Sequence, residues 1–314
     1  MYIGIDLGGT NIAAGVVDEN GKILAQDSTP TLAPRDYREI VKDMAALSEK
    51  IVKEAGLTMN DIKAIGIGSP GSIDYKKGSV AYANNLAFSD APLRAEFNKY
   101  YDIPVILEND ANAAAYGEYI VNGDNCSVFL AVTLGTGVGG GIIINNNIFR
   151  GANGAGGEIG HTTLVHNGIP CSCGRKGCWE SYASVTALIN QTKVAIEKHP
   201  ESLMKALAEE HGSVSGRTAF DAAKKGDAVA QEVVNKYVEY VADGIVSIVN
   251  IFQPEKVVIS GGISREGEYL LTPIREYVKK YDYNRLFPRT EIQAATLFND
   301  AGIIGAAFAA KNFG

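Results

Sequence analysis

The stretch "GIDLGGTNIAAGVV", residues 4–17, predicts the architecture of this chain. It reads as a buried apolar strand, a glycine turn and a second strand. The stretch "AVTLGTGVGGGIII", residues 131–144, follows the same plan. Strands and helices alternate after both, so we predict a duplicated α/β domain in which each half opens on a glycine hairpin. Glycine hairpins are common, and a chance likeness between the two is the competing interpretation.

The composition is that of a globular protein large enough for two domains. The chain has 314 residues, of which 46% are hydrophobic and 21% charged. It contains no apolar run long enough to span a bilayer, and "MYIGIDLGGT" resembles a strand rather than an export signal, which predicts a cytoplasmic protein. The net charge of -7, without a basic stripe, argues against nucleic acid as a partner, and the lack of a spanning run argues against a membrane.

The glycine-rich turns are not dinucleotide-binding loops. The pattern G-x-G-x-x-G occurs at residues 66–71 and 135–140, but a loop follows the first and a β-branched strand the second, where the fingerprint requires a helix. The backbone N–H groups of a glycine hairpin can still bind phosphate. We therefore expect three nucleotide contacts, at the turn after Asp6, at residues 133–137, and at Gly261-Gly262. Asp6 can hold a hydrated magnesium ion there, or simply cap a turn.

The segment "LEND", residues 107–110, ends a buried strand and begins an Ala-rich helix. Ligands of α/β domains gather at the carboxyl ends of strands. Asp110 can accept a proton from a hydroxyl nucleophile, as phosphoryl transfer requires. It can equally be a helix N-cap, and the two roles are compatible. Asn109 offers an amide that can both donate to and accept from one hydroxyl.

Three of the four cysteines lie within "GIPCSCGRKGCWE", residues 168–180. A cytoplasmic location disfavours a disulfide, and a nucleophile needs one cysteine rather than three. Cys171, Cys173, Cys178 and His161 complete a Cys₃His set without an open position, which predicts structural zinc. The spacing is not that of a standard Cys-x-x-Cys knuckle, and His166 is a minor rival to His161.

Carboxylates flank this cysteine loop. Glu158 precedes His161 by three positions and Glu180 follows Cys178 by two. Together with Asn109 and Asp110 they form a polar set suited to a polyhydroxylated ligand. Each glutamate considered alone can also be a solvated surface charge.

The chain resembles the ROK family of bacterial sugar kinases and repressors, and most closely its ATP-dependent glucokinases. The likeness covers essentially the whole chain. It is carried by the following motifs: Asp6-Leu-Gly-Gly-Thr10, Ser69-Pro-Gly71, Leu107-Glu-Asn-Asp110, Leu134-Gly-Thr-Gly-Val-Gly139, Glu158-Ile-Gly-His161 and Cys171-Ser-Cys-Gly-Arg-Lys-Gly-Cys-Trp-Glu180.

The resemblance implies an actin/hexokinase-like (ribonuclease H-like) α/β fold with a cleft between two domains. The small domain would be residues 1–111 plus 298–314. The large domain, 112–297, would carry the zinc loop and the contact of a homodimer, possibly a dimer of dimers. The implied activity is ATP- and Mg²⁺-dependent phosphorylation of a hexose, D-glucose first, at O6.

The resemblance also implies residue roles. Asp110 would be the general base. The nucleotide and phosphate contacts would be Asp6, Gly8, Gly9, Thr10, Asn11, Thr136, Gly137, Gly261 and Gly262. The sugar contacts would be Gly71, Asn85, Asn109, Asp110, Glu158, His161 and Glu180. His161 would hold zinc with one ring nitrogen and face the sugar with the other.

Two departures from the family pattern affect these assignments. The family often has Pro-Asn-Leu where this chain has Asn84-Asn85-Leu86, and alignment on Leu86 favours Asn85 as the sugar ligand. Many relatives carry Lys where Asn11 stands, so phosphate binding depends more on backbone and magnesium.

The alternatives are an N-acetylmannosamine, N-acetylglucosamine, mannose, fructose or allose kinase, a polyphosphate donor, or a sugar-sensing repressor, although no helix-turn-helix segment precedes the first strand.

Overall fold

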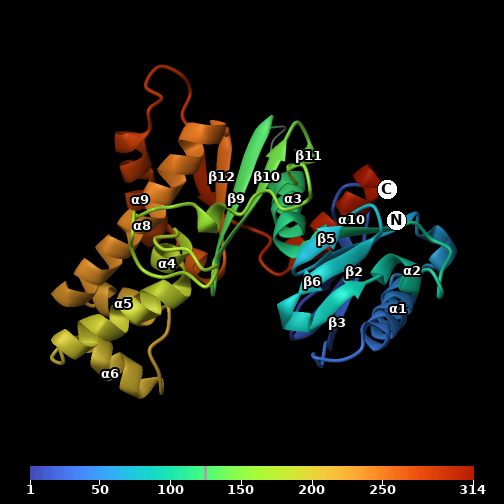
Figure 1. The fold of residues 1–314 in the computed structure, drawn as a ribbon, viewed down its shortest axis with the longest axis horizontal. Coiled ribbons are helices and arrows are strands. Elements are labelled where there is room, and N and C mark those ends of the chain that lie inside the picture. The colour runs from blue at the N-terminus through green and yellow to red at the C-terminus, as the bar shows by residue number, and fades with distance from the viewer. Residues whose placement is uncertain (124–125) are drawn as a thin grey trace. The chain divides into compact units, whose positions relative to one another are not determined.

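The computed structural model describes residues 1–123 and 126–314, which form two compact units. The first comprises Met1–Phe129, Gly141–Gly157 and Thr296–Gly314, and the second comprises Leu130–Gly140 and Glu158–Ala295. Figure 1 shows the elements of both. The first unit contains residues 112–129 and 141–157 in addition to the segments that the sequence assigned to the small domain. The boundaries 1–111 plus 298–314 and 112–297 stay a prediction.

The first unit is built on a five-stranded sheet in the order β3-β2-β1-β4-β8. Its strands are β1 (Tyr2–Leu7), β2 (Asn11–Val17), β3 (Ile23–Pro30), β4 (Ala64–Ser69) and β8 (Val105–Asn109). A three-stranded sheet contains β5 (Ser72–Asp74), β6 (Ser79–Ala83) and β7 (Phe88–Ala91). The helices are α1 (Tyr37–Glu54), α2 (Leu93–Phe97), α3 (Asp110–Asn122) and α10 (Asp300–Phe313), with 3₁₀ turns η1 (Met59–Asp61) and η2 (Asn84–Leu86).

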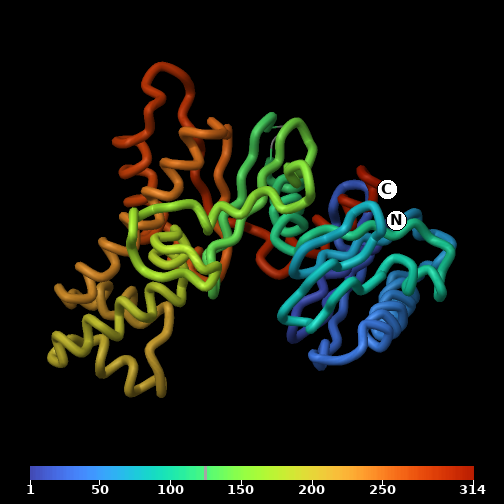
Figure 2. Tube along the Cα trace, in the orientation of Figure 1, coloured from blue at the N-terminus to red at the C-terminus, as the bar shows by residue number. Residues whose placement is uncertain are grey.

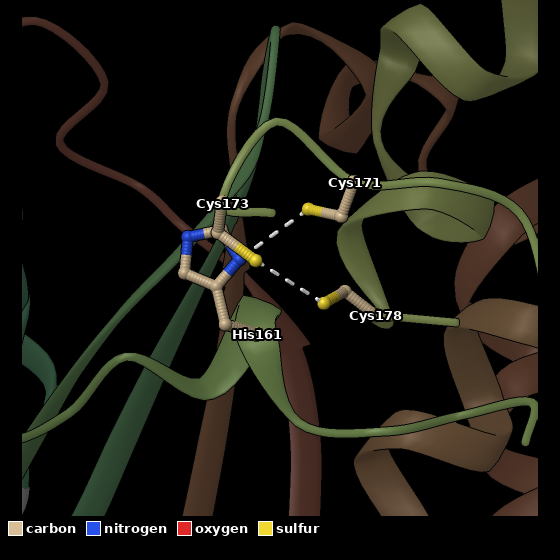
Figure 3. Close-up of side chains that lie close together, drawn as sticks. All are labelled: His161, Cys171, Cys173 and Cys178. Carbon is tan, nitrogen blue, oxygen red and sulfur yellow. Dashed lines mark hydrogen bonds between the residues drawn. The ribbon is translucent and has the colours of Figure 1, made fainter. Parts of the chain in front are cut away.

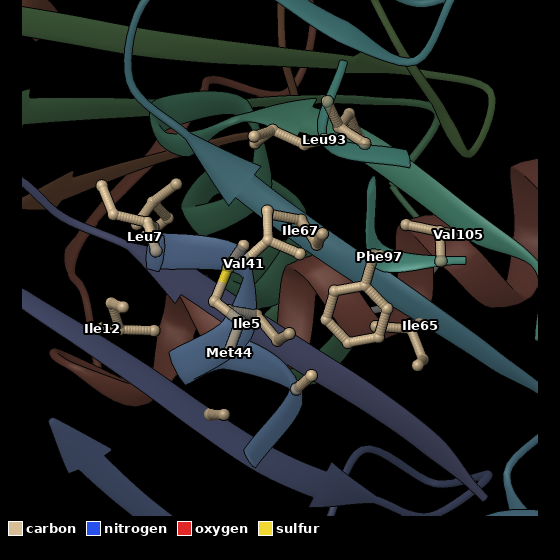
Figure 4. Packing of buried hydrophobic residues seen from close by; sticks show 14 of the residues in the cluster. Ile5, Leu7, Ile12, Val41, Met44, Ile65, Ile67, Leu93, Phe97 and Val105 are labelled. Atoms are coloured by element: carbon tan, nitrogen blue, oxygen red, sulfur yellow. The ribbon is translucent and has the colours of Figure 1, made fainter. Parts of the chain in front are cut away.

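The two faces of the first sheet are covered for different reasons. Side chains alternate along a strand, so Ile5 and Leu7 of β1 share one face, where they pack among the buried residues of α1 and α2 (Figure 4). The opposite face carries glycine. A Cβ on Gly4 would lie 1.8 Å from the carbonyl oxygen of Ile303, so the backbone of α10 lies directly on the sheet. Gly66 of β4 leaves the same space beside α10.

The second five-stranded sheet has the order β11-β10-β9-β12-β13. Its strands are β9 (Val128–Leu134), β10 (Val138–Ile144), β11 (Asn147–Ile148), β12 (Lys256–Ser260) and β13 (Glu291–Ala294). In chain order this is again third, second, first, fourth and fifth strand, as in the first sheet. The shared order confirms the predicted duplication of one α/β plan.

The second unit carries most of the remaining helices. These are α4 (Glu180–Ala183), α5 (Val185–Lys198), α6 (Leu203–Glu210), α7 (Thr218–Lys224), α8 (Ala228–Phe252) and α9 (Glu268–Tyr281), with 3₁₀ turns η3 (Ile159–His161) and η4 (Gly262–Glu266). The apolar stripe of α8 is buried and comprises Val234, Val238, Val241, Ile245 and Ile248. Within the parts of the chain that the structure describes, no helix is both long and apolar enough to cross a membrane.

The sequence interpretation missed the short strands β5, β6 and β7. The segment 69–78 was expected to be a loop, yet Ser72–Asp74 forms β5 and pairs with β6. The strand is too short for its side-chain alternation to be recognised. Residues 150–180 are irregular apart from η3 and the start of α4 (Figure 2).

Candidate active site and metal-binding cluster

Asp110 is the first residue of α3, directly after β8. The helix cap is Asn109, whose side-chain oxygen accepts hydrogen bonds from the backbone N–H groups of Ala111 and Asn112 at 3.0 and 3.2 Å. Asp110 also accepts from the N–H of Ala111, at 2.9 Å. Because Asn109 caps the helix, the carboxylate of Asp110 does not have to perform that role.

Asp6, near the end of β1, interacts electrostatically with Asp110. Burial, and then the negative charge of Asp110, raise the pKa of Asp6 to about 6. Burial also raises the pKa of Asp110, against the hydrogen bond from the backbone of Ala111. Asp6 lies against the first turn of α10, since a Cβ on Gly302 would be 2.6 Å from its Oδ2. The structure thus brings together two carboxylates that sequence separates widely.

The turn between β1 and β2 is held from outside by Thr31. The hydroxyl of this buried residue donates to the carbonyl of Gly8 at 2.6 Å, and its N–H donates to the carbonyl of Thr10 at 2.8 Å. The Gly8 N–H donates to the carbonyl of Asn11 at 2.9 Å. Thr10 and Asn11 are exposed. Hydrogen bonds within the protein therefore define the shape of the turn, as a preformed phosphate loop requires.

Three predicted sugar contacts lie beside this turn or beside Asp110 in the first unit. A Cβ added to Gly9 would lie 3.4 Å from the Cβ of Asn85, so these two residues are neighbours. The amide of Asn109 donates to the carbonyl of Gly71 at 3.3 Å. Gly71 has φ +95°, and a Cβ there would be 2.1 Å from the carbonyl oxygen of Tyr82, so only glycine fits.

The turn between β9 and β10 belongs to the second unit. The hydroxyl of Thr186 donates to the carbonyl of Thr136 at 2.8 Å, and the N–H of Val185 donates to that of Gly135 at 2.8 Å. The carboxylate of Glu180 accepts from the N–H of Val138 at 3.0 Å. A Cβ on Gly137 would lie 2.2 Å from the same carboxylate oxygen. A predicted sugar ligand and a predicted phosphate turn are thus in direct contact.

Gly262, the second residue of the glycine pair after β12, borders a hollow of about 620 Å³. Gly261 has φ +93°, and a Cβ on it would be 2.1 Å from the carbonyl oxygen of Leu134. The hollow is lined by Gly262, Val185, Ser215, Gly216, Arg217, Asp221, Lys224, Ile263, Arg265 and Glu266. Sequence reasoning found only the glycine pair, because ordinary charged residues on α7 and η4 carry no motif.

The predicted metal ligands converge. The ligand atoms of His161, Cys171, Cys173 and Cys178 all lie within 4.8 Å of one another. The Sγ of Cys171 lies 3.7 Å from Nδ1 of His161, and the sulfurs of Cys173 and Cys178 lie 3.6 Å apart. Figure 3 draws both contacts as dashed lines. Zinc–sulfur bonds of about 2.3 Å in a tetrahedron place sulfurs about 3.8 Å apart, so this set fits zinc.

The thiols also differ in acidity. Although burial raises the pKa of Cys171, hydrogen bonds involving Cys173 and Ser181 lower it to about 6. Burial and its two thiol neighbours raise the pKa of Cys178 to about 12. Thiols this close cannot all ionise together unless a cation balances their negative charges. Several thiolates around one cation are the charge arrangement expected of a metal site.

The loop around the cluster is anchored by the chain itself. The guanidinium of Arg175 donates to the carbonyl of His161 at 2.8 Å and to the hydroxyl of Thr163 at 2.7 Å. The buried indole of Trp179 donates to the carbonyl of Tyr240 on α8 at 2.9 Å. Glu158, at the start of η3, is exposed. His161 presents Nδ1 to the sulfurs, which leaves Nε2 for another partner.

These features define an actin/hexokinase-like protein, as predicted. The chain belongs to the ROK family, whose model matches residues 2–312. It is 37% identical over 312 residues to a glucokinase of Halalkalibacterium halodurans, covering 99% of this chain and 94% of the relative. It is 38% identical over 307 residues to a glucokinase of Thermotoga maritima, covering 97% and 95%. A ROK family glucokinase of Streptomyces griseus, solved in complex with glucose and AMPPNP, matches with a TM-score of 0.80 and 37% identity over 99% of both chains.

Proposed function

We propose that this protein is a sugar kinase that transfers the γ-phosphoryl group of ATP to O6 of a hexose, with D-glucose as the first choice. The observation that carries the proposal is near-complete coverage by glucokinases at 37% and 38% identity. The glucose and AMPPNP bound to the Streptomyces griseus relative support both substrates.

We assign Asp110 as the general base. Its place at the carboxyl end of β8 suits a residue that meets a ligand hydroxyl. Burial raises its pKa, which makes its carboxylate a stronger proton acceptor than an exposed aspartate. The proton of the sugar 6-hydroxyl would pass to Asp110 as the oxygen attacks the γ-phosphorus and the bond to the leaving ADP oxygen breaks.

The phosphates of ATP would be bound mainly by backbone N–H groups. We assign this role to Gly8, Gly9, Thr10 and Asn11 in the first unit, and to Thr136 and Gly137 in the second. Asp6 would hold magnesium through its water shell, and the ion would supply positive charge to the phosphates. The hollow that Gly262 lines is of a size suited to the nucleoside, and Gly261 precedes it in the chain.

We assign the sugar hydroxyls to two sets of residues. The first unit offers Gly71, Asn85 and Asn109, and the second offers Glu158, His161 and Glu180. Carboxylates and amides bind hydroxyls through short, directional hydrogen bonds, which a site for a polyhydroxylated ligand requires.

We propose zinc as the ion of the cysteine cluster, because three thiolates and one imidazole form a closed tetrahedral set. Its chemistry there would be structural, since all four positions are filled by protein. His161 would bind zinc through Nδ1, which would fix the ring and orient Nε2 toward the sugar.

The experiment that tests the function is an ADP-release assay with ATP·Mg²⁺ across glucose, mannose, fructose, allose, N-acetylglucosamine and N-acetylmannosamine, ranked by kcat/KM. We expect glucose to rank first. A clearly higher kcat/KM for N-acetylmannosamine would change the substrate and keep the kinase. Absence of turnover with every sugar would overturn the kinase, and sequence-specific, salt-sensitive DNA binding would then favour a repressor.

We also propose a homodimer, or a dimer of dimers. The segment between α9 and β13 exposes Tyr283, Leu286 and Phe287, each by 75% or more, and offers an apolar contact surface. Sedimentation of the wild type and of Leu286→Lys/Phe287→Lys tests this surface. A wild type that sediments as a monomer at micromolar concentration would refute the assembly.

A further inference from the structure

Glu108 is a fully buried carboxylate two residues before Asp110. It lies on β8, on the opposite side of the strand from Asn109, and the proposed chemistry does not use it. A buried carboxylate is unfavourable unless it is paired and hydrogen-bonded. The hydrogen-bond and charge partners of this side chain therefore indicate its role.

Five donors surround the carboxylate of Glu108. Oε1 accepts from the hydroxyl of Tyr75 at 2.7 Å, from the side-chain amide of Asn112 at 3.1 Å and from the backbone N–H of Asn109 at 3.0 Å. Oε2 accepts from Nε and Nη2 of Arg150 at 2.8 and 2.6 Å. Glu108 and the four residues that supply these donors all belong to the first unit.

Two of these donors flank Asp110. The N–H of Asn109 precedes it by one residue, and the side chain of Asn112 follows it by two. One oxygen atom of Glu108 therefore holds the chain on both sides of the proposed base. This bonding comes in addition to the cap that Asn109 forms on the first turn of α3.

Arg150 supplies the opposing charge and is itself held in place. Its guanidinium lies 4.7 Å from the ring centroid of Tyr75 and 4.8 Å from that of Phe313, at the end of α10. Tyr75 thus both donates to Glu108 and contacts its counter-ion. The cluster fixes Glu108 through three separate segments of the chain.

Stability alone is a poor explanation for this cluster. A buried ion pair is commonly no more stabilising than well-packed apolar residues of similar volume. What apolar residues cannot do is hold the N–H of Asn109 and the amide of Asn112 at one point. The geometry points to Glu108 as a positioning residue that sets the backbone and side-chain direction of Asp110, with Arg150 and Tyr75 holding Glu108.

This inference rests on the proposed function of Asp110, and a double-mutant cycle tests it. We compare Glu108→Gln in the wild-type background and in an Asp110→Ala background, with saturating glucose and ATP·Mg²⁺. We expect kcat to fall about 30-fold in the first and less than 3-fold in the second, because a residue that acts through Asp110 has nothing to position once Asp110 is gone. KM for both substrates should stay within 3-fold.

A second variant covers the case in which Glu108→Gln does not fold. Tyr75→Phe removes one donor and keeps the ring beside Arg150, and we expect a 3- to 10-fold fall in kcat that again disappears without Asp110. Tyr101→Phe is the matched control. It removes a tyrosine–glutamate hydrogen bond, to Glu49, elsewhere in the first unit, and should leave kcat unchanged.

Equal losses of kcat in the two backgrounds would overturn the positioning role. A variant that merely reduces the amount of folded protein would lower kcat equally in both backgrounds. They would leave the kinase standing, because the wild type would still phosphorylate glucose. A wild type that turns over no sugar would instead refute the proposed function itself.

Discussion

The carboxylate of Glu180 accepts a hydrogen bond from the backbone N–H of Val138 at 3.0 Å, at the end of the turn between β9 and β10. Its other oxygen lies 3.8 Å from the sulfur of Cys171. One side chain therefore contacts both the proposed phosphate turn and the proposed zinc cluster. This contact makes the effect of substitutions at Glu180 depend on what replaces the carboxylate.

Glu180→Gln should weaken sugar binding and spare nucleotide binding. The amide oxygen can still accept from Val138, but the charge that strengthens a bond to a sugar hydroxyl is lost, which corresponds to about 1.5–3 kcal/mol. We expect KM for glucose to rise about 10-fold or more, with KM for ATP within 3-fold. Glu180→Ala also leaves the Val138 N–H without its acceptor, so both constants should rise. Steady-state kinetics distinguish the two, and the exposed Glu210→Gln is the control. An unchanged KM for glucose in both variants would contradict the assignment.

Asp110→Asn should remove turnover and keep the fold. The asparagine oxygen can still accept from the N–H of Ala111, and Asn109 still caps α3, so the melting temperature should change little. General-base catalysis contributes about 10²–10⁴-fold, and we expect a fall in kcat of that size with KM nearly unchanged. Asp102→Asn, on the exposed segment before β8, should behave as the wild type. Activity within a few-fold of the wild type would show that Asp110 is not the base.

How much of this site could be read from the sequence depended on how local each part is. Cys171, Cys173 and Cys178 lie close together in the chain, and His161 is ten positions away, so counting and ligand chemistry were enough. The glycine turns were recognisable because each forms one local hairpin. Asn109 and Asp110 follow directly from the end of a strand.

The interactions that hold these parts could not be predicted in the same way. Glu108 and Arg150 are 42 positions apart and meet only because the first unit folds around them. The contact of Glu180 with Val138 spans the same separation. Alternation along β8 shows that Glu108 faces away from Asn109, yet no local pattern identifies its partners. Likewise, no local pattern shows that Gly4 and Gly66 leave room for the backbone of α10, which packs on them.

Cys173→Ser should lower zinc content and loosen the loop from Glu158 to Glu180. Metal ligands contribute directly to folding, so the variant should also melt at a lower temperature. We expect KM for glucose to rise at least 10-fold, with nucleotide binding less affected. Metal analysis of the purified protein and calorimetric titration of both ligands measure these effects. Cys126→Ser, outside the cluster, should retain one zinc per chain. Full activity in a wild type that contains no zinc would contradict the metal assignment.

The stability of the ligand-free protein should depend on pH through Asp6. Because burial and Asp110 raise the pKa of Asp6 from 3.8 to about 6, the folded protein binds this proton more tightly than the unfolded chain. Stability from Asp6 is therefore present below pH 3.8 and is lost as the pH rises to about 6. The shift corresponds to about 3 kcal/mol at neutral pH, so Asp6→Asn should stabilise the ligand-free protein at pH 8 by an amount on the order of 1–3 kcal/mol, and by much less at pH 4.

Urea unfolding in the presence of a chelator, at both pH values, measures this difference. Asp61→Asn is a control of opposite sign, because hydrogen bonds from the backbone and hydroxyl of Thr58 lower the pKa of Asp61. Its carboxylate contributes stability above its ordinary pKa that is lost as the pH falls, so the variant should be less stable at pH 8. If Asp6→Asn proved less stable than the wild type at pH 8, the burial of an uncompensated charge at this position would be refuted. If it is more stable and binds ATP·Mg²⁺ more weakly, Asp6 is a carboxylate that reduces stability and serves nucleotide binding.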